Sequence, residues 1–285
     1  MQNQNATVHW LIEIYKYLQY DQREGTLQLH HRMALINLWS PEPGSRILEI
    51  GCGQGETTVV LAVTVGLSGH VLAIDNSAAE YGEPVTLGES HAHIKSSSIG
   101  DRIDFLLSTD LLESQLDFPE KTFDLAIFSH SSWYMSSPQE LYRLFARVRP
   151  WARRLGYAEW DLRPRCRRQI PHVLAALLQT HVQRIWPQAP PANVHTLILP
   201  EGARLWAECA GWSIVKEQIV GTSTPLGYGK SWEIYKAIEM AEQFIDSAMA
   251  SEDVCRMLSA EKWLLDRLSN EAQNMSLSTY VFLAE

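Results

Sequence analysis

"RILEIGCGQGETTVVLA", residues 46–62, joins a short apolar run to a helical pattern through three glycines at alternate positions. Glycine costs backbone entropy, so Gly51, Gly53 and Gly55 together need a reason. Either the turn is tight, or a ligand lies directly against bare backbone. A dinucleotide site favours the spacing G-x-G-x-x-G, but the sixth position here is Glu56, whose carboxylate would repel a pyrophosphate. The stretch therefore predicts a strand, a glycine turn and a helix that serve a ligand other than a dinucleotide.

Strands and helices alternate on the C-terminal side of this turn. Helical patterns follow the first, second and fourth expected strands, the third leads directly to the fourth, and further helical segments precede each of the last two. Strands separated by helices form βαβ units, which predicts an α/β fold with a doubly wound, mostly parallel sheet and helices on both faces. The expected strands are 46–50, 70–75, 103–107, 123–129, 156–160, 212–220 and 278–283.

Helical patterns outside this alternation indicate additional segments. We expect an N-terminal helical cap over residues 1–40 and one ligand-binding domain over residues 41–285. Within that domain, helical insertions are expected at about 162–195 and 221–273. The second insertion precedes the last strand, so we expect it to act as a lid over the carboxyl edge of the sheet.

Composition limits the class of protein. The chain has 285 residues, 46% of them hydrophobic and 20% charged, which is typical of a globular protein. A net charge of −9 disfavours nucleic acid and anionic membrane as partners. No run of 18 apolar residues predicts a membrane span. Glu13 and Lys16 interrupt the N-terminal apolar pattern, so we expect no signal peptide.

The cysteines and histidines form no metal-ligand pattern. The four cysteines are far apart and include no C-x-x-C pair, which indicates reduced thiols in the cytoplasm. His91 and His93 lie in a polar segment that predicts a solvated helix. The sequence therefore predicts no metal site.

The glycine stretch and three further elements occur in an order that resembles the class I S-adenosylmethionine-dependent methyltransferases. "LEIGCGQG" matches their first motif, an acidic residue followed by G-x-G-x-G. "VLAIDNS" ends the second expected strand with Asp75, and "FLLSTDLL" places Asp110 after the third. The fourth strand and its exit loop, "FDLAIFSHSSWY", match in kind. The resemblance covers about residues 27–161 in motifs and the last two strands in layout.

The resemblance implies S-adenosylmethionine as cofactor and a seven-stranded sheet whose last strand is antiparallel. It places both ribose hydroxyls on Asp75, the adenine ring against Asn76 and the adenine amino group near Asp110. The implied cofactor-binding residues are Glu49, Gly51, Cys52, Gly53, Gln54, Gly55, Asp75, Asn76, Thr109, Asp110, Leu111 and Ser129.

Methyl transfer from a sulfonium depends mainly on positioning, and a general base is needed only when the nucleophile arrives protonated. His130 follows the fourth expected strand and is the candidate base; alternatively, its side chain only packs or forms hydrogen bonds. Trp133 and Tyr134 could form an aromatic wall of the substrate pocket or belong to the core. Tyr15, Tyr20, His172 and His195 lie on segments expected to cover this pocket, and the sequence does not rank them.

Two carboxylates and a group of arginines near the fifth strand have more than one interpretation. Glu159 and Asp161 could bind a substrate amine, although Asp161 could also cap a turn. Seven arginines between residues 149 and 168 could hold RNA phosphates or an anionic small molecule. The simpler interpretation is a solvated surface that pairs with the acidic helices of residues 231–273.

The loop after the fourth strand also bears on the substrate. It lacks the Asn/Asp-Pro-Pro-Tyr/Phe motif common in methyltransferases of nucleic-acid bases and of glutamine amides. We therefore predict a methyltransferase that acts on a small molecule. Two alternatives stay open: a fold relative that binds the cofactor but catalyses another step, such as cyclisation, and a non-catalytic regulator. The sequence leaves the substrate, the acceptor atom and the oligomeric state open.

Overall fold

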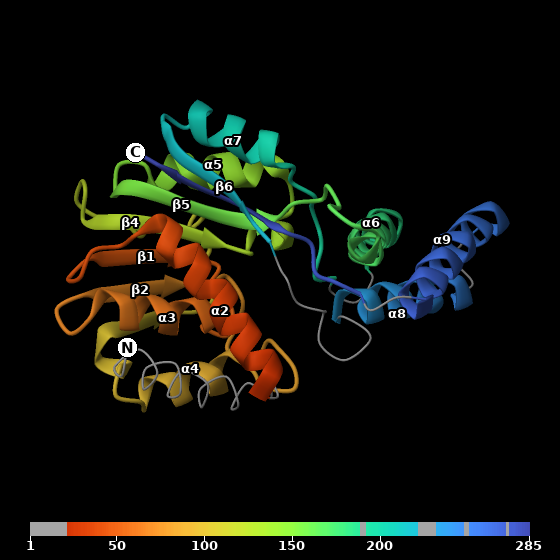
Figure 1. Cartoon of the computed structure of the whole chain (residues 1–285), viewed down its shortest axis with the longest axis horizontal. Coiled ribbons are helices and arrows are strands. Elements are labelled where there is room, and N and C mark those ends of the chain that lie inside the picture. The colour runs from red at the N-terminus through yellow and green to blue at the C-terminus, as the bar shows by residue number, and fades with distance from the viewer. Residues whose placement is uncertain (1–21, 189–191, 222–231, 248–250, 272–273) are drawn as a thin grey trace.

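A computed structural model describes residues 22–188, 192–221, 232–247, 251–271 and 274–285. In this part of the chain, seven strands form one sheet in the order β3-β2-β1-β4-β5-β7-β6 (Figure 1). The strands are β1 (Arg46–Ile50), β2 (His70–Ile74), β3 (Ile103–Leu106), β4 (Phe123–Ser129), β5 (Ala152–Trp160), β6 (Ile214–Val220) and β7 (Thr279–Ala284).

The strand directions confirm the predicted fold. The strands β1 to β5 are parallel to one another, whereas β7 runs antiparallel to both β5 and β6. The strand order reverses at β1, which pairs with β2 on one side and β4 on the other. Ile50 is in register with both Ile74 and Phe128, so the carboxyl ends of these three strands lie at one edge. Ligands of open α/β sheets bind at such a switch point.

Helices cover both faces of the sheet (Figure 1). One core contains residues of α2 (Gln22–Trp39), α3 (Glu56–Val65) and α4 (Leu87–Lys95). The other contains residues of α5 (Pro138–Val148) and α7 (Pro200–Cys209). Both cores are built from the alternating inward-facing residues of the same strands, as expected for a sheet buried on two sides.

The helix α2 is anchored in the core of the sheet domain. Trp39 is fully buried, and its Nε1 donates to the carbonyl oxygen of Phe282 at 3.0 Å. A Cβ on Gly156 would lie 3.0 Å from the Trp39 ring, so glycine in β5 permits this close approach. The division into an N-terminal cap and a methyltransferase domain stays a prediction, and Tyr15 and Tyr20 lie outside the described residues.

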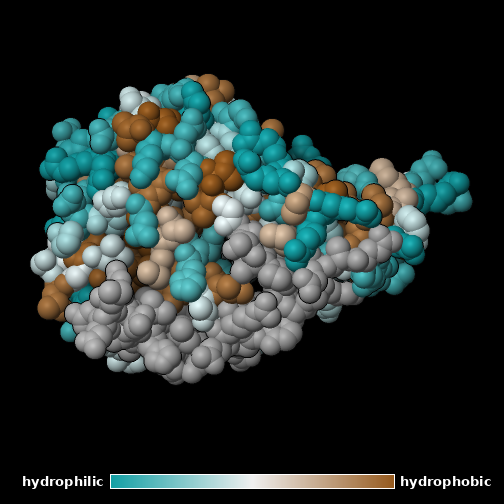
Figure 2. All heavy atoms as spheres, in the orientation of Figure 1, coloured by the Kyte–Doolittle hydropathy of each residue, from teal (hydrophilic) through white to brown (hydrophobic). Residues whose placement is uncertain are grey.

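Three helices form a separate packed group beside the sheet (Figure 1). The helix α6 (Ile170–Ile185) packs against both α8 (Trp232–Asp246) and α9 (Glu252–Glu271), and their shared core includes Leu178, Met240 and Leu265. The two predicted insertions therefore contact each other. Figure 2 shows hydrophilic side chains over the projecting end of the group. Within the described residues, no helix combines the length and apolarity that a membrane span requires.

Candidate functional site

The glycine turn lies at the carboxyl end of β1. Gly51, Gly53 and Gly55 all have positive φ angles, of 73°, 52° and 92°. A Cβ on Gly51 would collide with Ser131, and one on Gly55 would lie 2.7 Å from Cδ1 of Ile94. A Cβ on Gly53 would meet no atom within 4 Å. Gly51 and Gly55 therefore permit close packing, whereas Gly53 borders open space where a ligand fits.

The helix α4 packs against this turn and donates hydrogen bonds to its carbonyl oxygens. His91 donates from Nε2 to the carbonyl oxygen of Gly53 at 2.7 Å, and Ser90 donates to that of Gln54 at 2.6 Å. His91 is buried and stacks on Phe105, and burial lowers its pKa. The predicted solvated position of His91 is therefore wrong. One face of this short helix is buried against the glycine turn, a contact that the polar composition of the segment did not indicate.

Asp75 connects the end of β2 to the glycine turn. Its buried carboxylate accepts the Gly53 N–H at Oδ2 and the Ser77 N–H at Oδ1, both at 2.9 Å. Each carboxylate oxygen has two acceptor positions, so one on each remains for ligand hydroxyls. The pKa of Tyr81 is raised, mainly by burial and further by the Asp75 carboxylate. The donor and acceptor pattern therefore fits a ribose, as the resemblance implies.

Glu49 lies beneath the turn, with 1% of its surface exposed. Its Oε2 accepts the Thr58 hydroxyl at 2.6 Å. Burial raises the pKa of Glu49 to about 8, and the carboxylates of Glu56 and Asp75 add to the shift. An approaching ammonium group would favour the ionised form, so this buried carboxyl suits the amino-acid end of the cofactor. Burial also raises the pKa of the neighbouring Cys52 thiol, which makes it unreactive.

The loops after β2 and β3 are joined at the same edge. The Thr109 N–H donates to the carbonyl oxygen of Asp75 at 3.0 Å. Asn76 and Asp110 are exposed, and Leu111 is buried. Asp110 caps its own turn by accepting the Leu112 N–H at 2.8 Å. The residues implied for cofactor binding therefore lie along one edge, and their individual contacts stay predictions.

His130 lies beside this edge, directly after β4. Its φ is 53°, and its backbone N–H donates to the carbonyl oxygen of Ala158 at 2.8 Å. Nδ1 lies 3.3 Å from Oε1 of Glu159, and Nε2 lies 3.1 Å from Nε2 of His31. Burial lowers the pKa of His130, although Glu159 opposes the shift. The imidazole is therefore neutral at neutral pH, and the network assigns its proton to Nδ1.

His31, on α2, completes a chain of polar contacts across the sheet edge. Its Nε2 also lies 3.1 Å from the Thr279 hydroxyl oxygen at the start of β7. Burial lowers the pKa of His31 to about 2, so this ring is neutral as well. Since Nε2 of His130 carries no proton, we assign the shared hydrogen to Nε2 of His31. Three residues from separate elements, His31, Glu159 and Thr279, thus hold the His130 ring in a single orientation.

Glu159 positions the loop that follows β4. Its Oε2 accepts the Ser132 N–H at 3.0 Å, the Ser132 hydroxyl at 2.7 Å and the Trp133 N–H at 3.2 Å. Only 2% of its surface is exposed. Glu159 therefore acts on the protein's own loop, and the alternative of a contact with a substrate amine is not supported. Asp161 pairs instead with Arg163 at 2.7 Å.

Aromatic rings surround His130. His31 stacks on Trp160 with centroids 5.7 Å apart, and His130 lies 4.3 Å from the same indole. His172, on α6, lies 5.4 Å from Trp160 and 6.0 Å from Trp133. We call these five rings the aromatic cluster. Of the members from distant segments, His172 was expected on a segment that covers the site, whereas sequence spacing could not identify His31 and Trp160.

Tyr134 and Glu233 complete the surroundings of the aromatic cluster. Tyr134 is half exposed, whereas Trp133 is buried. The carboxylate of Glu233, at the start of α8, acts to raise the pKa of both His130 and His172. The start of α8 is joined to α6, the helix of His172, because Gln179 donates to the carbonyl oxygen of Glu233 at 2.9 Å.

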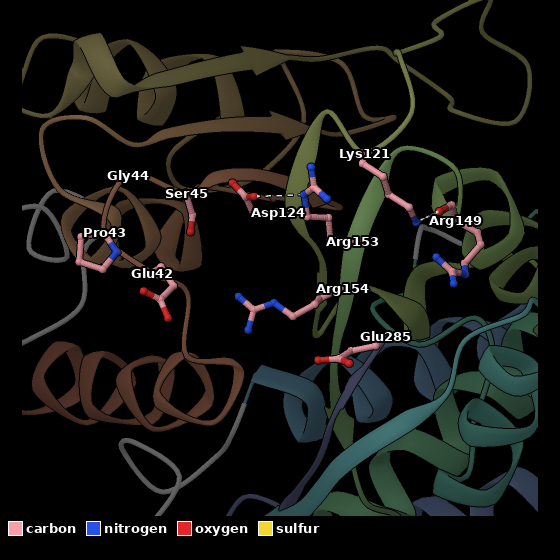
Figure 3. Close-up of a pocket in the computed structure, with 10 residues that line it drawn as sticks. All are labelled: Glu42, Pro43, Gly44, Ser45, Lys121, Asp124, Arg149, Arg153, Arg154 and Glu285. Atoms are coloured by element: carbon pink, nitrogen blue, oxygen red, sulfur yellow. Dashed lines mark hydrogen bonds and ion pairs between the residues drawn. The ribbon is translucent and has the colours of Figure 1, made fainter.

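A separate hollow of about 690 Å³ lies at the opposite edge of the sheet (Figure 3). It contains none of the cofactor motifs. Lys121 donates to the carbonyl oxygen of Ala152 at 2.8 Å, and Arg153 pairs with Asp124 at 3.7 Å. The residues that line it are Glu42, Pro43, Gly44, Ser45, Lys121, Asp124, Arg149, Arg153, Arg154 and Glu285.

The arginine-rich segment does not form one patch. The nine-residue strand β5 separates the arginines of this hollow from Arg163, which pairs with Asp161 and Glu201. For Arg153 and Arg163, the expected pairing with the helices of residues 231–273 is therefore wrong. Among the described residues, no group of three or more His, Cys, Asp or Glu side chains is arranged to hold a metal ion.

Comparison with known proteins identifies relatives over the motif region. A family model described as a methyltransferase domain matches residues 47–156, from β1 into β5. Methyltransferase phomM of Diaporthe leptostromiformis is 33% identical over 156 residues, which cover 47% of this chain and 39% of that protein. The 2-phytyl-1,4-naphtoquinone methyltransferase of Synechococcus elongatus is 32% identical over 113 residues, covering 37% of this chain and 41% of that protein. The chain thus spans about two fifths of the length of these curated relatives.

One solved structure is similar over nearly the whole chain. It is a cyclopropane-fatty-acyl-phospholipid synthase-like protein from Lactobacillus casei, with a TM-score of 0.82 and 30% identity. The match covers 97% of this chain and 98% of that one. The strand order, the glycine turn and the buried Asp75 agree with this similarity. The chain belongs to the class I S-adenosylmethionine-dependent methyltransferases, and its cofactor is S-adenosylmethionine.

Proposed function

We propose that the protein transfers a methyl group in line from S-adenosylmethionine to a small molecule. One observation carries the proposal: a buried, neutral His130, oriented by Glu159, lies beside the cofactor edge and within an aromatic cluster. The net charge of −9 and the division of the arginines between two edges of the sheet support a small acceptor over nucleic acid. The S. elongatus relative is named for a naphthoquinone substrate, which supports the same class.

The protein's part in this reaction is mainly to hold the reactants. Bound S-adenosylmethionine supplies an electrophilic methyl group. We assign Asp75 to the ribose hydroxyls, Glu49 to the amino-acid end and the backbone at Gly53 to the closest approach. The loop after β4, ordered by Glu159, forms the boundary between cofactor and acceptor. Correct orientation in a site that excludes water supplies much of the rate in such a transfer.

We assign the base role to Nε2 of His130. Its lone pair receives a hydrogen from His31 in the described structure, at an Nε2–Nε2 distance of 3.1 Å. A substrate O–H or N–H would take the place of His31 and lose its proton to this nitrogen. Glu159, 3.3 Å from Nδ1, would then stabilise the imidazolium that forms.

The test uses the whole chain, methyl-labelled S-adenosylmethionine and a metabolite extract. We expect label in a small, protein-free product, and labelling slowed roughly 10²–10⁴-fold when His130→Ala replaces the wild-type chain at neutral pH. Label on protein or nucleic acid would contradict the small-molecule proposal. Tight cofactor binding without transfer to any fraction would contradict methyl transfer and favour a cofactor-dependent step of another kind or a regulator.

A further inference from the structure

Two buried N–H groups in the aromatic cluster have no hydrogen-bond acceptor among the described residues. The first belongs to His172, which is fully buried. Its Nδ1 accepts the Leu277 N–H at 3.0 Å. In a neutral imidazole, one nitrogen accepts and the other carries the hydrogen, so the proton of His172 lies on Nε2. Burial lowers the pKa of His172 and keeps the ring neutral. Nε2–H is therefore a donor for which the described part of the chain provides no acceptor.

The second group is the indole N–H of Trp133, a side chain that is 3% exposed. Its position is set by its backbone, which donates to Glu159 and accepts from the N–H groups of His195 and Thr196. Its ring lies 6.0 Å from that of His172, at an interplanar angle of 75°. A buried donor without an acceptor destabilises a protein. Two such donors on neighbouring rings leave two hydrogen bonds that the described residues do not satisfy, and an acceptor atom of a bound molecule would satisfy them.

The charges near His172 restrict the chemistry of that ligand. The ionisable carboxylates that act on it are those of Glu233 and Glu159, and both favour positive charge. A carboxylate or phosphate on the ligand would be repelled by these two groups. A neutral oxygen accepts the same hydrogen bonds without this repulsion. Trp160 contacts both His130 and His172, so such an oxygen would lie about one ring away from the candidate base.

We propose that His172 and Trp133 bind a neutral carbonyl oxygen of the methyl acceptor. The acceptor is then an apolar or aromatic molecule that carries a ketone, ester, amide or quinone group. This proposal rests on the small-molecule function proposed above. It assigns a specificity-determining pair, separate from the residues that hold the cofactor.

The test measures binding to the cofactor-loaded chain with three matched probes. 1-Tetralone carries a neutral carbonyl, tetralin lacks the oxygen, and 1-naphthoate carries a carboxylate. Trp133→Phe removes one donor and keeps a ring. His172→Asn removes Nε2–H and retains an oxygen that can accept the Leu277 N–H. Trp263→Phe, on the exposed side of α9, is the control. Cofactor affinity, measured for each variant, reports whether the fold is intact.

We expect 1-tetralone to bind more tightly than the other two probes. Each donor variant should weaken 1-tetralone about threefold to tenfold, as expected for one neutral hydrogen bond, and leave tetralin unchanged. The indole N–H resonance of Trp133 in the wild-type chain should also move downfield with 1-tetralone. This measurement tests the proposal even where a variant does not fold.

Several results would overturn the carbonyl site. They are equal binding of 1-tetralone and tetralin, tighter binding of 1-naphthoate, no effect of either variant, or no binding of 1-tetralone up to its solubility. The outcome is separable from the proposed function. Methyl transfer that is insensitive to both variants would remove the carbonyl site alone. Donor-dependent 1-tetralone binding without any methyl transfer would remove the methyltransferase activity alone.

Discussion

Replacement of Asp75 is the most direct test of the cofactor site. Two ribose hydroxyls would donate to the free acceptor positions of this carboxylate. Hydrogen bonds to a charged group contribute about 1.5–3 kcal/mol each, and water competes for both, so we expect Asp75→Ala to cost about 2–3 kcal/mol of cofactor binding. That loss corresponds to a dissociation constant raised roughly 30- to 160-fold.

The structure adds a second effect, because Asp75 also accepts the Gly53 and Ser77 N–H groups at 2.9 Å. Asp75→Ala leaves both donors without their acceptor, so we expect it to lower the free energy of unfolding by about 1–3 kcal/mol. Asp75→Asn retains one acceptor oxygen and should fall between alanine and wild type in both measurements.

Titration calorimetry with S-adenosylmethionine and thermal unfolding measure the two effects separately. Asp104→Asn is a matched control, since this exposed carboxylate on β3 pairs only with His70 and Lys95 at the surface. Its cofactor affinity should equal that of the wild type. Unchanged affinity in a folded Asp75→Ala variant would refute the assignment of the ribose to this residue.

Four other changes have defined outcomes. Gly53→Val should weaken cofactor binding more than Gly53→Ala, because both substitutions strain a φ of 52° and valine also fills the open space. If calorimetry gives both variants the affinity of the wild type, the glycine turn has only a structural role. The Glu49 pKa of about 8 exceeds its unfolded value, so the stability that this residue contributes is complete below about pH 4.5 and is lost as pH rises through 8. From pH 5 to 8, the unfolding free energy of Glu49→Gln should therefore rise by a few kcal/mol relative to that of the wild type. Denaturant titrations in which this difference stays constant would contradict the argument. His130→Ala should lower turnover roughly 10²–10⁴-fold while cofactor affinity is retained. The loss of turnover should shrink as pH rises, because the substrate then ionises without a base. A loss that does not change with pH would indicate a packing role. Residues 221–273 should exchange amide hydrogens more slowly when cofactor and substrate are both bound, and unchanged exchange would exclude a lid.

Local sequence determined the elements that hold the cofactor. The strand, glycine turn and helix of residues 46–62 are contiguous, so composition and spacing alone specify them. Asp75 follows the next strand directly, and parallel strands connected by helices bring their carboxyl ends to one edge. The seven-stranded sheet and its antiparallel last strand followed from the resemblance that these motifs carry, and the structure confirms both; the order of the strands comes from the structure.

Tertiary structure alone decided the environment of the candidate base. His31, His130, Glu159 and Thr279 come from α2, the loop after β4, the end of β5 and the start of β7. They meet because β7 inserts beside β5 and α2 packs across the sheet, and no sequence spacing records either event. The burial of His91 beneath the glycine turn, and the separation of the arginines by β5, have the same origin. A side chain's partners depend on which surfaces pack together, whereas its strand or helix depends mainly on its neighbours in the chain.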